Sequence, residues 1–421
     1  MQSPFTLRMA GWAGLFLLFH SLMAEASTPQ LSVLGTAPDW SRLDAYQYTV
    51  KETAFREALD RLYAPREAWQ GLITFHEDHA AIRTGRHSPP YRLYWKSEDT
   101  QQDPPSPCWT SAEMLRQRLA ANPPDQPLRG LHVALDPGHI GGDYAIMEER
   151  HFAIGDDAPV REGDLTLEVA HRLRDRLVAL GAQVSLLRDA PLPVTTATPE
   201  SLRPDALAWA QRRREAGGLS GPAPAEDVDA LADLLFYRVA EIRARAVLVE
   251  QLCPDIVLCL HFNAAPWPDS DRQTLVDERH AHILINGSYS AGELALDDVR
   301  LVMLERLLAG LHDEEKPLAA ALAASMAAAT GLPPFVYDGP PAVAIDGEPY
   351  VCGRNLLANR LFPAPVIFLE PYIMNDLIHY ARIQAGDYDG LRDHGEGPRL
   401  SIYREYVAWV VDGLLRYYRK D

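Results

Sequence analysis

From Leu128 onward the sequence alternates short apolar runs with amphipathic segments, and this alternation limits the fold more than any other feature of the chain. The apolar runs are predicted strands, at residues 131–136, 182–187, 256–261, 282–285 and 365–370. Helical patterns at residues 164–180, 241–252 and 318–330 separate them. Continuously apolar strands linked by amphipathic helices are typical of a parallel sheet with both faces covered. We therefore predict an α/β fold, with a mostly parallel sheet and helices on both faces.

Residues 27–125 follow a different pattern and are predicted to form a small α+β domain with a linker. Apolar residues at helical spacing between 49 and 62 predict a helix, and three short runs between 71 and 95 predict strands. We place the domain boundary near Asp125. The remaining residues, 126–421, then form the α/β domain, with insertions at about 190–240 and 288–317.

The first 26 residues have the pattern of an export signal. Arg8 precedes an apolar run at 9–24, and Ala24-Glu25-Ala26 has the small residues that a signal peptidase requires. The run of about 16 residues is shorter than the roughly 20 that a membrane span needs, although an uncleaved anchor is the alternative. We predict an exported, periplasmic protein without a stable membrane span. Its net charge of −18 argues against nucleic acid as a partner.

The chain contains four cysteines, and an exported protein is free to form disulfides. Cys253 and Cys259 are separated by mostly extended chain, which places their Cα atoms farther apart than a disulfide tolerates. Cys108 and Cys352 could pair, but nothing in the sequence decides their state.

Four polar residues lie where the predicted strands end or a helix begins. His139 follows the first strand, His261 and Glu370 end two others, and Glu162 directly precedes the long helix. Taken singly, each has a simpler explanation, such as a loop histidine or a glutamate at a helix N-terminus. However, the carboxyl ends of parallel strands meet at one edge, where ligands bind. Two histidines and one carboxylate suit hydrolytic zinc, and a further carboxylate suits proton transfer.

Four sequence blocks resemble the motifs of a known enzyme family in the same order: LHVALDPGHIGG, VREGDLTLEVAHRLRDRLVALGAQVSLLRD, PDIVLCLHFNA and PAPVIFLEPYIMND. The family is the zinc-dependent N-acetylmuramoyl-L-alanine amidases of the Amidase_3 type, and the resemblance covers roughly residues 128–421. It implies that His139, Glu162 and His261 bind zinc and that Glu370 is the catalytic glutamate. It also implies a substrate, peptidoglycan, which is cut between the lactyl group of muramic acid and L-alanine.

The sequence departs from the family pattern in three places. After His139 the chain reads Ile-Gly-Gly, where Gly-Gly is usual. The loop between His139 and Glu162 is longer than usual and contains Glu148, Glu149 and His151, any of which could compete as ligands. After Glu370 the chain reads Pro-Tyr-Ile-Met-Asn, which changes the wall beside the catalytic carboxylate and fits an unusual peptide stem.

Further residues are candidates for secondary roles. Arg188 and Asn263 are predicted to hold substrate or to orient the site, with a structural ion pair and a loop-capping amide as the alternatives. Some amidases of this family carry an inhibitory helix that an activator protein removes. By analogy, an acid of the second insertion could reach the zinc, and the candidates are Glu293, Asp297 and Glu305. The alternative is an ordinary helix that packs its leucines on the domain.

Two other functions are compatible with these residues. One is a zinc amidohydrolase of small acyl-amino acids, similar to formylglutamate amidohydrolase, although an export signal argues against a cytoplasmic metabolite as substrate. The other is a catalytically silent relative that binds the cell wall. Loss of turnover in Glu370→Gln with zinc retained would distinguish an enzyme from the silent relative.

Overall fold

The computed structural model describes residues 29–219 and 221–419, so the predicted export signal lies outside the described residues. The centre of the fold is a seven-stranded sheet. Its strands, from one edge to the other, are β10 (Val343–Ile345), β11 (Glu348–Gly353), β9 (His282–Ile285), β12 (Val366–Glu370), β8 (Ile256–Leu260), β4 (His132–Pro137) and β7 (Gln183–Leu186). Four neighbouring pairs are parallel, whereas β10 with β11 and β9 with β12 are antiparallel. The predicted mostly parallel sheet is confirmed.

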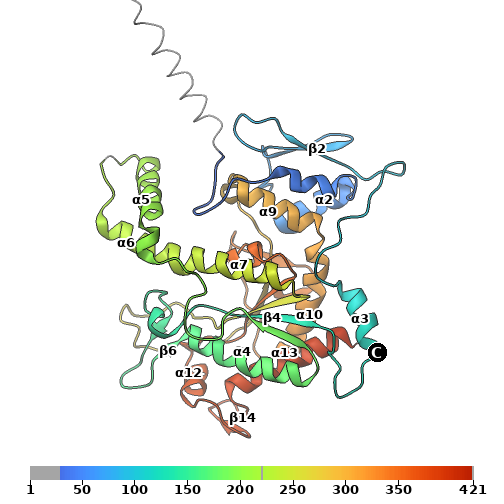
Figure 1. The fold of residues 1–421 in the computed structure, drawn as a ribbon. Coiled ribbons are helices and arrows are strands. Elements are labelled where there is room, and N and C mark those ends of the chain that lie inside the picture. Colours follow the sequence, from blue (N-terminus) through green and yellow to red (C-terminus); the bar gives the residue numbers. More distant parts are fainter. Residues whose placement is uncertain (1–28, 220, 420–421) are drawn as a thin grey trace, which may run out of the picture.

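Helices cover both faces of this sheet (Figure 1). On one face lie α4 (Glu162–Ala179), α10 (Leu311–Thr330) and α13 (Ile402–Tyr418), and on the other lie α7 (Glu241–Leu252) and α11 (Leu357–Leu361). Alternate residues along each strand enter the two cores, as the period of a strand requires. In β12, for example, Ile367 and Leu369 belong to the first core, and Val366 and Phe368 belong to the second.

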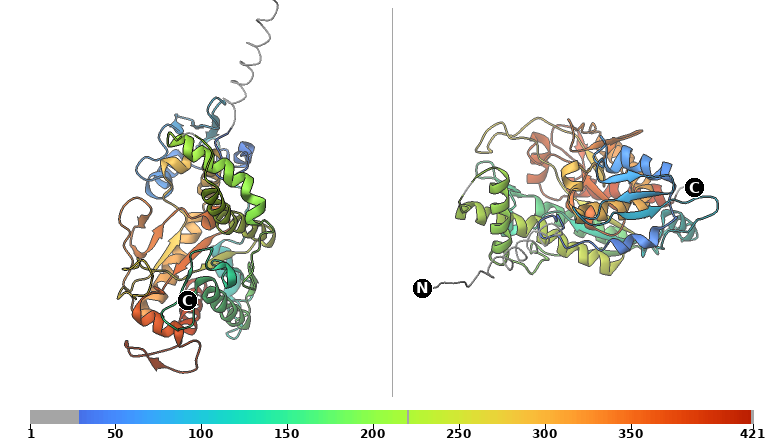
Figure 2. Two further views of the ribbon diagram at one scale, coloured as in Figure 1. Left: turned by 90° about the vertical axis from the view of Figure 1, so that its left-hand side faces the viewer. Right: turned by 90° about the horizontal axis from the view of Figure 1, so that it is seen from above.

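The residues before the sheet form short helices and a small antiparallel sheet. The elements are η1 (Trp40–Tyr46), α2 (Glu52–Ala58), η2 (Leu59–Tyr63), β1 (Ile73–Phe75), β2 (His79–Ile82), β3 (Tyr91–Tyr94) and α3 (Ala112–Ala120). Of these, η1, α2 and η2 pack beside α9 (Asp297–Leu308), whereas α3 packs against α13 (two further views in Figure 2). Apart from Trp109, the buried hydrophobic residues of this part belong to the same hydrophobic cluster as one face of the central sheet. The domain boundary near Asp125 stays a prediction.

The two insertions are helical. In the first, α5 (Pro199–Ala216) and α6 (Ala225–Leu234) form a hairpin, and η4 (Leu235–Ala240) continues from it into α7 (Figure 1). In the second, α8 (Ala291–Leu294) and α9 precede α10. No helix within residues 29–219 and 221–419 is both long and apolar enough to cross a membrane.

The disulfide of the structure joins Cys108 to Cys253, so the suggested pairing of Cys108 with Cys352 is wrong. Cys253 ends α7, and Trp109, next to Cys108, packs in the same core as α7. Cys352 lies on β11 and is a buried free thiol, as is Cys259 on β8. Cys253 and Cys259 do not pair with each other, as the spacing predicts.

Candidate metal centre

His139 is held on a tight turn at the end of β4. Its φ of 61° lies in the left-handed region, which is uncommon for a residue with a side chain. The preceding Gly138 packs against the imidazole of His261, and a Cβ at this position would overlap the ring. The Asp-Pro-Gly-His turn therefore brings the two histidines together, and only glycine leaves room for that approach.

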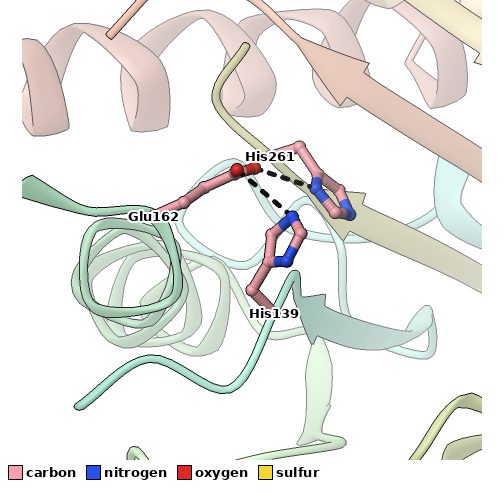
Figure 3. A group of neighbouring side chains, drawn as sticks. All are labelled: His139, Glu162 and His261. Carbon is pink, nitrogen blue, oxygen red and sulfur yellow. Dashed lines mark hydrogen bonds and ion pairs between the residues drawn. The ribbon is translucent and has the colours of Figure 1, made fainter. Parts of the chain in front are cut away.

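Glu162 and His261 complete a compact group with His139. Glu162 is the first residue of α4, two residues before the predicted start of the helix, and His261 directly follows β8. The Glu162 carboxylate lies 3.2 Å from Nε2 of His139 and 3.1 Å from Nδ1 of His261. One donor atom from each of the three residues lies within 4.8 Å of the others. Figure 3 shows the carboxylate pointing toward a ring nitrogen of each histidine.

The donor set fits a zinc ion. Two imidazole nitrogens and one carboxylate are a ligand set of hydrolytic zinc sites, with the fourth position left open. On its other ring nitrogen, His139 faces Glu148, whose carboxylate lies 3.6 Å from Nδ1. A carboxylate at the second nitrogen is typical of metal-ligating histidines, because it fixes the tautomer and the orientation of the ring. His139, Glu162 and His261 are thus the residues that could hold a metal.

The charges of the group are those of a cation site. Burial disfavours the protonated form of His139, but Glu162 and Glu148 outweigh burial and raise its pKa to about 9. Burial likewise works against the ionised form of Glu162, and the two histidines nevertheless hold its pKa well below the usual range. The two carboxylates therefore make the position of the His139 ring favourable for a positive charge.

The loop candidates between His139 and Glu162 lie in three different environments. Glu148 is buried and accepts hydrogen bonds from the backbone amides of Ile140 (2.9 Å) and Gly141 (3.1 Å). Glu149 lines the cavity beside the site, whereas His151 lies in the short strand β5 (His151–Phe152), which pairs with β6 (Val160–Arg161). Glu148 therefore faces Nδ1 of His139, the ring nitrogen opposite the one that faces Glu162. Neither Glu149 nor His151 belongs to the group of His139, Glu162 and His261.

Glu370 ends β12 and faces the same cavity, which has a volume of about 420 Å³. Burial, reinforced by the charge of Glu162, raises the pKa of Glu370 to about 8. A carboxyl group with this pKa can both accept and donate a proton near neutral pH. His139, Glu162, His261 and Glu370, which come from four separate segments of the sequence, thus line one cavity.

The two candidates for secondary roles occupy different positions. Arg188 is buried outside the cavity lining and donates hydrogen bonds to the carbonyls of Gly163 (2.9 Å), Pro137 (3.4 Å) and Ala190 (2.8 Å). It thus connects the turn before His139 to the first turn of α4. Asn263 lines the cavity, and its side-chain oxygen accepts a hydrogen bond from the amide of Ala264 (2.8 Å).

The acids of the second insertion lie away from the cavity lining. Glu293 closes a capping box with Ser290 and accepts a hydrogen bond from Asn355 (2.7 Å). Asp297 is buried and pairs with Arg300, and Glu305 pairs with Arg42 at 2.7 Å. The structure does not bring any of the three to the His139–Glu162–His261 group.

Sequence reasoning missed several residues of the cavity wall. Arg150 lies in the long loop and contacts the Glu162 carboxylate at 3.2 Å. Tyr237 and Arg238 come from η4, and Arg354 follows β11. Arg354 follows a strand that the sequence pattern does not predict, and the other residues lie in a loop or an insertion, so only the folded chain identifies them.

Comparisons with known proteins give two results. No protein-family model matches the chain, and no curated protein matches it. Among solved structures, the amidase Ami1 of Mycobacterium smegmatis is 17% identical, covering 70% of this chain and 99% of its own, with a TM-score of 0.37. An N-acetylmuramoyl-L-alanine amidase of Clostridium difficile 630 is 14% identical, covering 70% and 99%, with a TM-score of 0.38. The catalytic domain of CwlV, an amidase of Bacillus (Paenibacillus) polymyxa var. colistinus, is 14% identical, covering 69% and 99%, with a TM-score of 0.37.

Proposed function

We propose that this protein is a zinc-dependent peptidoglycan amidase that cleaves the amide between N-acetylmuramic acid and L-alanine. The observation that carries the proposal is the His139–Glu162–His261 group, whose donor atoms lie within 4.8 Å of one another in a cavity that also contains Glu370. The choice of substrate rests on the four ordered sequence blocks. The export pattern of residues 1–26 supports action in the periplasm, where peptidoglycan is accessible.

His139, Glu162 and His261 would hold the ion. Bound there, zinc would supply Lewis acidity, which polarises an amide carbonyl and makes water a better nucleophile at neutral pH. Two buried arginines keep the His139 ligand in place. Arg245 donates to the carbonyl of His139 at 2.9 Å and pairs with Asp136 at 2.7 Å, and Arg188 holds the same turn to α4.

Glu370 would transfer the proton. Its carboxylate accepts a proton from the attacking water and then donates it to the departing nitrogen of L-alanine, so that one proton is carried between two positions in the cavity. Burial supports this role because it brings the pKa of Glu370 close to neutrality. Glutamine at this position would keep the shape of the side chain and remove its capacity to accept a proton.

Digestion of purified peptidoglycan tests the proposal. Mature protein with zinc is expected to release free stem peptides that begin at L-alanine, and mass spectrometry identifies them. The Glu370→Gln variant is expected to bind zinc as the wild type does and to release none. Intact peptidoglycan in the presence of the zinc-loaded wild type would contradict the proposal.

A further inference from the structure

We infer that Arg354 forms a carboxylate-binding subsite that recognises an acidic group on the departing peptide. The inference rests on the proposed function and adds a specificity determinant to it. Arg354 follows β11, is half-buried, and lines the same cavity as His139, Glu162 and Glu370.

Most charges in the cavity wall are already paired. Arg245 is fully buried between Asp136 (2.7 Å) and Glu241 (2.8 Å), and Arg150 lies 3.2 Å from the carboxylate of Glu162. Two further arginines line the cavity, Arg238 and Arg354. Within residues 29–219 and 221–419, neither has a carboxylate within 4.0 Å. Arg238 is exposed, so Arg354 is the half-buried arginine of this wall that has no carboxylate within ion-pair distance, although its charge acts on Glu370 across the cavity.

Arg354 is held in place by contacts that leave most of its guanidinium donors available. Its backbone amide donates to the carbonyl of Ile285 at 2.9 Å. Its Nη1 donates to the hydroxyl of Tyr337 at 3.2 Å, and the guanidinium lies over the Tyr337 ring at 5.4 Å. Tyr337 is itself fixed by a contact of 2.9 Å between its hydroxyl and Nε2 of His282. Because a guanidinium has five donors in a planar fork, one bond to a phenol leaves the fork free for a carboxylate.

The position of Arg354 indicates which part of the substrate it meets. His282 on β9 pairs in register with Glu370 on β12, and Arg354 is linked to His282 through Tyr337. In the proposed reaction, Glu370 gives a proton to the departing nitrogen, so the peptide leaves on the side of the cavity that Glu370 occupies. The peptide stem contains carboxyl groups, whereas the lactyl carboxyl of the sugar is consumed in the amide. Arg354, which has no carboxylate partner in an ion pair, therefore lies where it can bind a carboxyl group of the peptide and not a group of the glycan.

Direct binding of two matched ligands tests the subsite. Both are N-acetylmuramoyl tripeptides of L-alanine, γ-linked D-glutamate and L-lysine, and they differ only in whether the α-carboxyl of the glutamate is free or amidated. Calorimetry on zinc-loaded Glu370→Gln, which is not expected to turn the ligands over, measures Kd for each. Because hydrogen bonds between charged groups are stronger than those to an amide, the acid is expected to bind about tenfold or more tightly than the amide.

Variants assign this preference to Arg354. Arg354→Gln, introduced into the Glu370→Gln protein, is expected to weaken binding of the free-acid ligand until its Kd equals that of the amidated ligand. The Kd of the amidated ligand should stay unchanged within about twofold. Arg354→Lys is expected to keep part of the preference, because it retains the charge but not the fork. Arg360→Gln is the matched control, because Arg360 is also half-buried but lines a different cavity and donates to Asn355 at 3.0 Å.

The outcomes separate the subsite from the proposed function. Equal Kd values for the acid and the amide in the Glu370→Gln protein would overturn the subsite, and so would a preference that persists in Arg354→Gln. If Arg354→Gln fails to fold, the acid-to-amide ratio of the Arg354→Lys protein decides, and an undiminished ratio would overturn the subsite. A wild type that prefers the acid in binding but cleaves neither ligand would confirm the subsite and contradict the amidase.

Discussion

At the scale of single residues, the proposed site depends on side chains that support His139, Glu162 and His261, the three residues that could hold a metal. Glu148 is the clearest of these, since its buried carboxylate faces Nδ1 of His139 and accepts two backbone amides of the following turn. In the sequence the same residue is a candidate competing ligand. The fold decides between these roles, because it places Glu148 against the ring nitrogen that points away from Glu162.

Loss of the Glu148 carboxylate is expected to weaken zinc binding. Glu148→Gln should lower zinc affinity by about 10- to 100-fold, the usual effect of removing a carboxylate that orients a ligating histidine. Competition with a chromogenic chelator measures the change. Glu149→Gln is the control, because Glu149 lines the cavity but has no contact with His139. Equal affinities for the two variants would show that Glu148 does not orient the ligand.

A buried histidine outside the site is expected to make stability depend on pH. Burial, together with the charge of Arg382, lowers the pKa of His379 to about 3 from 6.5. Because the pKa is lower in the folded state, the unfolded chain binds the proton more strongly. Protonation of His379 in the unfolded chain therefore lowers the free energy of unfolding. This loss is absent well above pH 6.5 and grows as the pH falls from 6.5 toward 3. At pH 5 the loss should be about 2 kcal/mol.

Denaturant unfolding at pH 7 and pH 5 checks this prediction. The difference in unfolding free energy between the two pH values should be smaller in His379→Gln than in the wild type. His87→Gln, a change at an exposed histidine, should leave the difference unaltered. If the difference in unfolding free energy between pH 7 and pH 5 is as large in His379→Gln as in the wild type, groups other than His379 cause the pH dependence.

At the scale of elements, the second insertion is built as part of the core. In α9, Leu301, Met303 and Leu304 are almost fully buried, and the pair of Arg300 with Asp297 is buried as well. Glu305, which is half-buried, pairs with Arg42 of the N-terminal part. These contacts favour a packing role for α9 over an inhibitory one.

Two substitutions in α9 distinguish packing from inhibition. Leu304→Ala should lower the free energy of unfolding by about 2–5 kcal/mol, as large-to-small changes in a core do. Glu305→Gln should change the rate of peptidoglycan cleavage by less than about twofold, since its carboxylate is away from the cavity. A rise of tenfold or more in the rate for Glu305→Gln would instead support self-inhibition.

The sequence predicts the central strands well because their burial makes them continuously apolar, as in β8 and β12. It does not predict β10 and β11, the last two strands on one side of the sheet, where five of the nine residues are exposed or half-buried. The reversed direction of β9 and the partner of Cys108 are set by contacts between distant segments. His139 can be identified from the pattern because it follows a strand that the sequence predicts, whereas Arg354 follows β11, which the sequence does not predict.

At the scale of the whole molecule, the N-terminal part is fixed to the edge of the central sheet. The carbonyls of Leu62 and Tyr63 accept the amides of Ser288 and Tyr289, each at 2.7 Å. Leu62 also packs on Gly287, where any larger residue would overlap it. The disulfide from Cys108 to Cys253 adds a covalent connection between this part and α7. The N-terminal part is therefore joined to the α/β part by backbone hydrogen bonds, by packing and by one covalent bond.

The central claim is that the chain hydrolyses one particular amide, and cleavage in water enriched in ¹⁸O tests it most directly. A zinc-loaded wild type should convert an N-acetylmuramoyl tripeptide into two products, with one ¹⁸O atom in the lactyl carboxyl group of the sugar and none in the peptide. Mass spectrometry locates the label. Label in a carboxyl group of the peptide, or in no carboxyl group of either product, would contradict the account.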